Sequence, residues 1–133
     1  LLDNLATTDN IIVLYTGDSP GIVKKVFAAT GLGKYFRFYF TGTEVATRAD
    51  MVQQAINQVE KLTGRKFASK DIVIIGDSIR DIDCGKQFNA LTIAVSTGFH
   101  SASELLSHEP DYLFSSLEDY WAIIKAISYK RKV

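Results

Sequence analysis

Five short apolar runs mark the chain, and segments with helical spacing separate them. The runs are residues 11–15 (IIVLY), 36–40 (FRFYF), 71–77 (DIVIIGD), 91–95 (LTIAV) and 111–114 (DYLF). The first, third and fourth are apolar at successive positions, which is typical of strands covered by helices on both faces. The second alternates, so we expect it nearer to an edge of the sheet.

The intervening segments carry helix start and stop signals. Helices are expected to begin after Ser19, Thr47 and Ser101, whose side chains are suited to N-caps, and to end near glycines. A short helix is expected over 81–88, and a last helix from about 116 to 128. Strand–helix alternation at this spacing predicts a parallel sheet with right-handed crossovers. The expected fold is a Rossmann-like, three-layer α/β/α arrangement over residues 1–133 as a single domain segment.

Composition narrows the class of protein. The chain has 133 residues, and its 15 basic and 15 acidic side chains cancel, which gives no electrostatic case for a nucleic acid or membrane partner. The single cysteine, Cys84, cannot form an internal disulfide. Because no apolar run approaches a bilayer-spanning length and no signal peptide is visible, we expect a cytoplasmic protein.

Two carboxylates stand where the chemistry of such a sheet is expected. Ligands gather at the carboxyl ends of parallel strands, and the third apolar run ends at Asp77, with Asp81 four residues later. Two oxygen donors that converge on one point suit Mg²⁺, which keeps several of its waters. The alternative is that Asp77 caps the loop and Asp81 caps the helix. Asp83 falls on a different helical face, and we expect it to be solvated.

The first apolar run ends at Thr16 and Gly17. A hydroxyl and backbone N–H groups at a strand–helix turn can hold a phosphate, although such a threonine can also cap the next helix. Arg48 begins the helix after the second run and could direct a fixed positive charge at an oxyanion. A lone arginine on a helix is usually a solvated surface residue, and the local sequence alone favours that role for Arg48.

These segments together resemble the haloacid dehalogenase (HAD) superfamily, with most similarity to its phosphoglycolate phosphatase-like branch. The similarity rests on IIVLYTG, then TRADMV, then IVIIGDSIRDI, in the order and spacing of the second, third and fourth motifs of the family. The segment from Ser96 to Ile124 also resembles the C-terminal part of the family core.

The resemblance implies a Mg²⁺-dependent phosphomonoester hydrolase that acts on a small phosphorylated metabolite through an aspartyl-phosphate. Thr16 would hydrogen-bond a phosphoryl oxygen beside Gly17, and Arg48, where the family more often has lysine, would neutralise developing charge. Asp77 would ligate Mg²⁺, and Asp81 would support the metal directly or through water. Thr16, Arg48 and Asp77 are therefore the expected catalytic residues.

One part of the family pattern is missing. The first motif, a strand that ends in DxDx[TV] and carries the nucleophile, does not occur in the chain, and neither does the helical cap. In the family this strand lies between those that end at Thr16 and Asp77. We therefore expect an N-terminal segment or a second chain to complete the sheet.

Three alternatives remain. A catalytically inactive, HAD-like binding or regulatory module fits the missing nucleophile but not the intact GDSIRD. A receiver-like signalling domain would need an acidic pair after the first strand, where the chain has Thr16, Gly17 and Asp18. A dinucleotide-binding domain is weaker still, because GLGK (31–34) follows a helix and does not match the glycine fingerprint.

Overall fold

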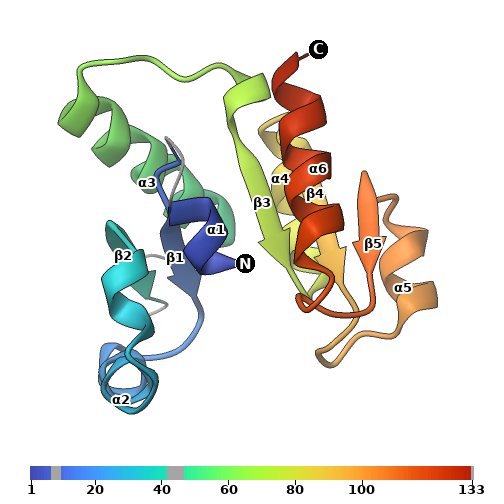
Figure 1. Cartoon of the computed structure of the whole chain (residues 1–133), viewed down its shortest axis with the longest axis horizontal. Coiled ribbons are helices and arrows are strands. Elements are labelled where there is room, and N and C mark those ends of the chain that lie inside the picture. The colour runs from blue at the N-terminus through green and yellow to red at the C-terminus, as the bar shows by residue number, and fades with distance from the viewer. Residues whose placement is uncertain (7–9, 42–46, 133) are drawn as a thin grey trace. The chain divides into compact units, whose positions relative to one another are not determined.

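The computed structural model describes residues 1–6, 10–41 and 47–132. These residues fold into two compact units, which we call the first unit (residues 2–65) and the second unit (from Lys66 onward). Helices and parallel strands alternate in both (Figure 1). The α/β class and the parallel pairing expected from the sequence are therefore confirmed.

The first unit contains two parallel strands. Its elements are α1 (Leu2–Ala6), β1 (Val13–Thr16), α2 (Pro20–Thr30), the 3-10 helix η1 (Leu32–Tyr35), β2 (Phe38–Thr41) and α3 (Arg48–Thr63). The pairing of β1 with β2 runs in register from Val13 opposite Phe38 to Thr16 opposite Thr41. Both strands therefore end at the same edge of this small sheet.

Local chemistry sets where α2 and α3 begin and end. The Ser19 hydroxyl accepts a hydrogen bond from the backbone N–H of Ile22 at the start of α2, and Thr47 accepts one from Asp50 at the start of α3. Each helix ends at a left-handed glycine, Gly31 with φ of 69° and Gly64 with φ of 68°. The sequence-based boundaries of these helices are confirmed.

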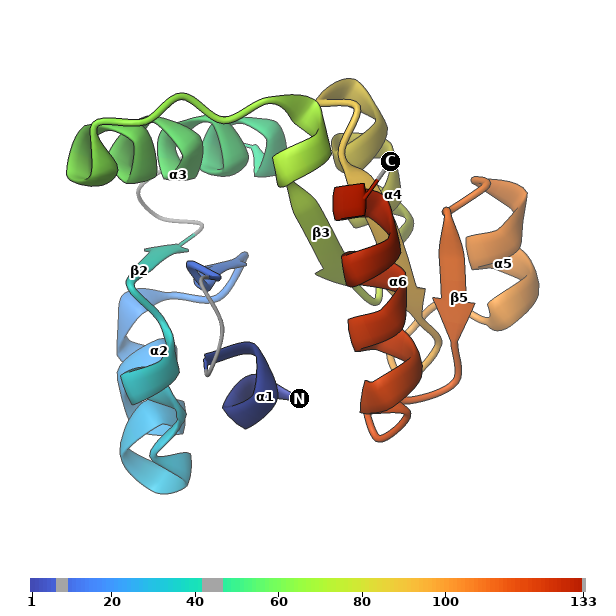
Figure 2. The same ribbon diagram turned by 45° about the horizontal axis from the view of Figure 1, so that its top comes forward.

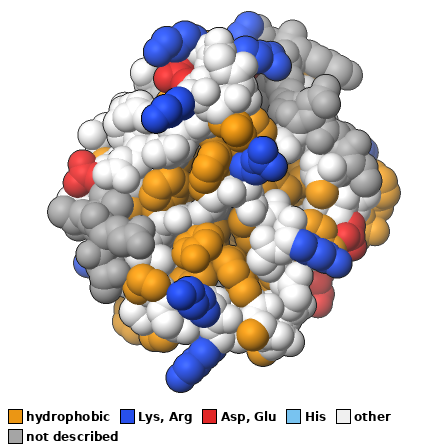
Figure 3. Space-filling view, turned by 90° about the vertical axis from the view of Figure 1, so that its left-hand side faces the viewer, with side chains coloured by type: hydrophobic (Ala, Val, Ile, Leu, Met, Phe, Trp, Pro, Cys, Tyr) orange, Lys and Arg blue, Asp and Glu red, His pale blue; other side chains and the backbone are white. Residues whose placement is uncertain are grey.

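Helices cover both faces of the two strands. Phe40 and Met51 are buried between β2 and α3, and Val13 and Phe38 pack against them. On the opposite face, the ring of Phe27 on α2 meets the edge of Tyr39 at 5.8 Å between centroids. Hydrophobic side chains nevertheless remain visible at the surface (Figure 3). In the first unit the large exposed ones are Ile11, Ile22, Val26, Leu32, Tyr39 and Leu62.

The second unit contains three parallel strands in the order β3-β4-β5. Its elements are the 3-10 helix η2 (Ser69–Asp71), β3 (Val73–Gly76), α4 (Ile79–Gln87), β4 (Leu91–Val95), α5 (Ala102–Ser107), β5 (Tyr112–Phe114) and α6 (Tyr120–Lys132). Figures 1 and 2 show α6 on the face of this sheet opposite α4, with α5 beside β5. The unit thus has three layers, as the sequence predicts.

The central strand of the second unit is its core. All five residues of β4 are buried, which explains why the sequence there is continuously apolar apart from Thr92. Ile82, Ala94 and Leu105 form one buried cluster beneath α4 and α5. Helix α4 approaches the sheet closely at Gly85, where an added Cβ would lie 2.2 Å from the Thr92 methyl carbon. Only glycine allows this approach.

The polar side chain of Thr92 is satisfied inside this core. Asp111 Oδ2 accepts hydrogen bonds from the backbone N–H of Thr92 at 2.8 Å and from its hydroxyl at 3.1 Å. The backbone N–H of Asp111 donates to the same hydroxyl at 2.9 Å. This exchange ties the start of β5 to β4, since a buried polar group without a partner would destabilise the fold.

The four terminal strands of the two sheets, β1, β2, β3 and β5, each have one edge without a partner strand among the described residues. Strand β1 pairs only with β2, and β3 pairs only with β4. Strands β1 and β3 are the two between which the HAD resemblance implies a missing partner. Exposed N–H and C=O groups along such an edge can pair with a further strand.

The last helix differs from the expectation. It begins at Tyr120, four residues later than the expected start near Ser116, because a turn occupies residues 117–118. Its buried residues are Ile123, Ala126 and Ile127. The apolar spacing of the predicted helix over 116–128 also places Leu117 and Trp121 toward the core, but they are 46% and 61% exposed. Among the described helices, none combines the length and apolarity needed to cross a membrane.

Candidate metal and phosphate site

The second unit places Asp77 directly after β3. Gly76 is opposite Ala94 in the parallel register, so the residues that follow the two strands leave the sheet at the same edge. Asp77 is exposed there, and its carboxylate lies against the backbone of Gly98, which follows β4. The expectation that the chemistry lies at the carboxyl ends of the strands therefore fits the position of Asp77.

Asp81 lies in the first turn of α4 and is 6% exposed. Its Oδ2 accepts a hydrogen bond from the backbone N–H of Ser78 at 3.1 Å. The Ser78 hydroxyl accepts one from the backbone N–H of Arg80, also at 3.1 Å. The Asp81 carboxylate also packs against Gly76, where an added Cβ would lie 2.1 Å from Oδ2. The helix-capping role considered for Asp81 is thus present, and it holds this carboxylate next to the end of β3.

These two carboxylates fit the donor chemistry of Mg²⁺. Asp77, which directly follows β3, is exposed, and Asp81, in the first turn of α4, is buried. Mg²⁺ typically binds through one or two carboxylates and keeps several of its waters. Within the described ranges, no group of three or more His, Cys, Asp or Glu side chains could hold a metal. A metal at Asp77 and Asp81 would therefore need water or ligand oxygens to complete its coordination.

Asp83 has a separate role on the other side of α4. Its Oδ1 lies 2.8 Å from Nδ1 of His108, the residue that ends α5. The side chain of Asp83 is 57% exposed, in agreement with the solvated position expected from the sequence. Asp83 and His108 therefore link α4 to the end of α5.

Thr16 and Gly17 end β1 in the first unit. The Thr16 hydroxyl accepts a hydrogen bond from the backbone N–H of Asp18 at 3.1 Å, which closes the turn before α2. Gly17 is exposed, and a Cβ added there would meet no atom within 4 Å. The turn is therefore locally ordered and has open space above it, as a phosphate-binding turn requires.

Arg48 is the first residue of α3, and its side chain is partly buried. Thr47, the residue before it, caps the helix and thereby fixes the backbone from which the guanidinium projects. Thr16, Gly17 and Arg48 all belong to the first unit, whereas Asp77 and Asp81 belong to the second. Their convergence on one phosphate stays a prediction from the sequence.

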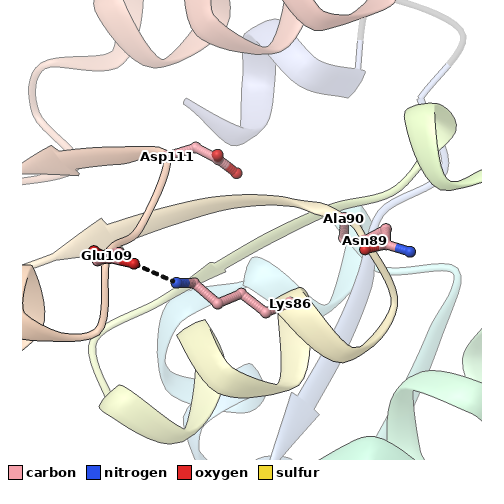
Figure 4. Close-up of a pocket in the computed structure, with 5 residues that line it drawn as sticks. All are labelled: Lys86, Asn89, Ala90, Glu109 and Asp111. Carbon is pink, nitrogen blue, oxygen red and sulfur yellow. Dashed lines mark ion pairs between the residues drawn. The ribbon is translucent and has the colours of Figure 1, made fainter.

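A shallow pocket lies at the other end of the sheet of the second unit. Figure 4 shows its lining residues, Lys86, Asn89, Ala90, Glu109 and Asp111. Ala90 and Asp111 immediately precede β4 and β5, so this pocket is at the amino ends of the strands. Lys86 Nζ and Glu109 Oε2 are 3.7 Å apart, and the positive charge on its wall is thus already paired.

Ser78 and Gly98 are expected at this edge of the sheet because they follow the third and fourth apolar runs, but their contacts were not predicted. Ser78 caps α4, which begins at Ile79 and not at Asp81 as expected, although the series Ser78–Asp81 is a recognisable capping box. Gly98 contacts Asp77 across 21 positions of sequence, and no local pattern gives that contact. The strand register had to be known first.

The sequence profile of the HAD-hydrolase-like family matches residues 46–120, which is more than half of the chain. This match includes Arg48, Asp77 and Asp81 and ends just as α6 begins. It does not include Thr16.

Individual relatives extend the similarity. Pyrophosphatase PpaX of Listeria monocytogenes is 26% identical over 96 residues, which cover 72% of this chain and 43% of the relative. The phosphoglycolate phosphatase of Synechococcus elongatus is 23% identical over 119 residues, which cover 90% of this chain and 53% of the relative. The chain thus spans about half the length of these relatives.

Solved structures show the same fold. A predicted phosphatase from Clostridium acetobutylicum superposes with a TM-score of 0.78 at 22% identity, over 92% of this chain and 56% of the other. A haloacid dehalogenase-like hydrolase from Streptococcus pneumoniae gives a TM-score of 0.77 at 19% identity, with the same coverage of both chains. The profile match and the shared fold confirm the resemblance found in the sequence, and the chain belongs to the HAD-hydrolase-like family.

Proposed function

We propose that this chain is the metal- and phosphate-binding part of a Mg²⁺-dependent phosphomonoester hydrolase that acts on a small phosphorylated metabolite. The observation that carries the proposal is the placement of two carboxylates at the end of β3: Asp77 directly follows the strand, and the Asp81 carboxylate, in the first turn of α4, lies against Gly76 and accepts from the Ser78 N–H. The names of the relatives, a pyrophosphatase and a phosphoglycolate phosphatase, support phosphate chemistry.

In this proposal, different residues of the chain bind the metal, bind the phosphate and stabilise negative charge. Asp77, exposed at the strand end, would bind the metal directly, and the buried Asp81 would support the metal directly or through a water molecule. Thr16 and the backbone N–H groups at Gly17 would bind phosphoryl oxygens, and Arg48 would stabilise negative charge as it develops. A bound Mg²⁺ would supply positive charge that offsets repulsion between a carboxylate nucleophile and the phosphate.

The nucleophile would come from outside residues 1–133. No DxDx[TV] occurs in the chain, and β1 and β3 each have a free edge among the described residues. We propose that an N-terminal segment or a second chain adds a strand there, and that the whole protein acts in the cytoplasm. The missing motif also favours a second candidate function, an inactive HAD-like module that binds phosphate without turnover.

The test is the Mg²⁺-dependent hydrolysis of p-nitrophenyl phosphate by the whole protein that carries this chain. Asp77→Asn removes one negative charge at the proposed ligand with little change in shape, so we expect activity to fall to the level measured with EDTA while the circular dichroism spectrum stays the same. Asp83→Asn is the matched control, because Asp83 is a nearby carboxylate on α4 that pairs with His108. Full activity of Asp77→Asn would contradict the metal assignment. An inactive wild-type protein that still binds phosphate would favour the second candidate.

A further inference from the structure

Gly98 lies against the carboxylate of Asp77. A Cβ built on Gly98 would be 2.2 Å from Oδ2, 2.7 Å from Cγ and 3.0 Å from Cβ of Asp77. Non-bonded carbon and oxygen atoms do not approach so closely, so the carboxylate occupies the volume that any other residue at position 98 would fill. The contact involves the whole Asp77 side chain and not only its tip.

The strand register creates this contact. Strands β3 and β4 are parallel neighbours, and Gly76 is opposite Ala94. The chain leaves β3 at Asp77 and leaves β4 at Ser96, and the turn there brings Gly98 beside the end of β3. The turn itself is loosely packed, since the next residue, Phe99, is 96% exposed.

The backbone at Gly98 does not itself require glycine. Its φ lies outside the left-handed range in which Gly31 and Gly64 are found, so an alanine there would not be strained. A Cβ at this exposed position would therefore press on Asp77 and would leave the core unchanged. Because Asp77 is a short side chain on a turn, it would have to rotate about χ1 to make room.

From this geometry we infer that Gly98 is a positioning residue for the metal ligand Asp77: its missing side chain is the space in which the carboxylate is held for Mg²⁺. The inference rests on the proposed function, and it concerns orientation and not charge. Residues that orient a metal ligand typically change metal affinity by about 10- to 100-fold when they are replaced.

Gly98→Ala is the variant that tests this role. Mg²⁺ affinity is measured by calorimetric titration of the whole protein, below the melting temperature of every variant. We expect about tenfold weaker binding or more, with an unchanged circular dichroism spectrum. Gly21→Ala is the matched control, because a Cβ at Gly21 would meet no atom within 4 Å and φ there is not positive either. A second readout is the Mg²⁺ dependence of hydrolysis, in which saturating Mg²⁺ should recover most of kcat in Gly98→Ala but not in Asp77→Asn.

The outcomes separate this inference from the proposed function. Wild-type affinity in Gly98→Ala, together with lost binding in Asp77→Asn, would overturn the role of Gly98 and leave the metal site standing. Equal affinity in wild type, Gly98→Ala and Asp77→Asn would overturn the metal site itself. An unfolded Gly98→Ala would also overturn the inference, because only the carboxylate should have to move.

Discussion

Single side chains in this protein are held by short-range partners that their neighbours in sequence supply. The side chains of Asp81, Thr16 and Thr47 accept hydrogen bonds from the backbone N–H groups of Ser78, Asp18 and Asp50, respectively. Thr47 thereby caps α3, whose first residue is Arg48. In each case a turn or cap hydrogen bond fixes the backbone next to a proposed functional group. Local order at these positions is therefore independent of any bound ligand.

Arg48 is the residue whose role is most open to direct test. In the whole protein, Arg48→Ala should lower kcat for p-nitrophenyl phosphate by about 10²-fold, because a fixed charge directed at a developing oxyanion acts mainly in the transition state. Steady-state kinetics measure the effect. Arg37→Ala, an exposed arginine just before β2, is the control. A change below about twofold in Arg48→Ala would assign the side chain to the solvated surface.

At the scale of elements, the sequence predicted the five strands well. Short, continuous apolar runs bounded by glycines and helix caps are typical of buried parallel strands, and β4 occupies residues 91–95 as expected. Helix starts were harder to predict. Leu117 continues the apolar spacing of α6 backward, but it lies in the turn at 117–118, before the helix begins, and its side chain is exposed. Trp121 is in the first turn of α6 and is exposed as well.

The site was predictable only in part, for a related physical reason. Asp77 and Asp81 follow β3 in one continuous segment, so the position of each relative to the end of that strand depends on local geometry alone. Gly98 reaches Asp77 through the pairing of β3 with β4, and the apolar pattern of each strand does not by itself say which strands are neighbours. A contact between loops that follow different strands can be predicted only when the order of the strands in the sheet is known.

Helix α5 has a charged cap that predicts a pH effect. The Ser101 N–H donates to Glu104 Oε1 at 3.1 Å, and this backbone hydrogen bond, followed by one with the Ser101 side chain and by His100, lowers the pKa of Glu104 below its usual 4.5. A carboxyl group with a lowered pKa in the folded state stabilises the fold above its ordinary pKa, and that contribution is lost as the pH falls through the lowered value.

An NMR titration of the Glu104 side-chain carboxyl group measures this directly. Its midpoint should lie below 4.5 in the wild-type chain and should move up toward 4.5 in Ser101→Ala, which removes the reciprocal hydroxyl partner. A wild-type midpoint at or above the ordinary value would mean that the capping box does not persist in solution.

At the scale of the whole molecule, each of the two parallel sheets has two edges without a partner among the described strands, and β1 and β3 each form one of these edges. The chain spans about half of the relatives it matches. The proposed Mg²⁺ ligands and the proposed phosphate ligands are divided between the two units. Under the proposed function, catalysis would therefore require residues of both units as well as the additional strand.

The purified chain of residues 1–133 should accordingly have no Mg²⁺-dependent phosphatase activity, because it contains no DxDx[TV] nucleophile. The measurement is the release of p-nitrophenol with and without Mg²⁺ at high protein concentration. Turnover that Mg²⁺ stimulates and Asp77→Asn removes would contradict this prediction, because residues 1–133 would then contain their own nucleophile.

The close approach of α4 to β4 at Gly85 has a consequence for how this protein can diverge. Because a single methyl group at position 85 would collide with the methyl group of Thr92, position 85 can gain a side chain only where residue 92 lacks that methyl group. A lineage could therefore gain alanine at 85 only after serine had appeared at 92, because serine lacks the methyl group and keeps the hydroxyl that accepts from the backbone N–H of Asp111. The two sites should therefore covary among homologues, with the order of replacement fixed by packing.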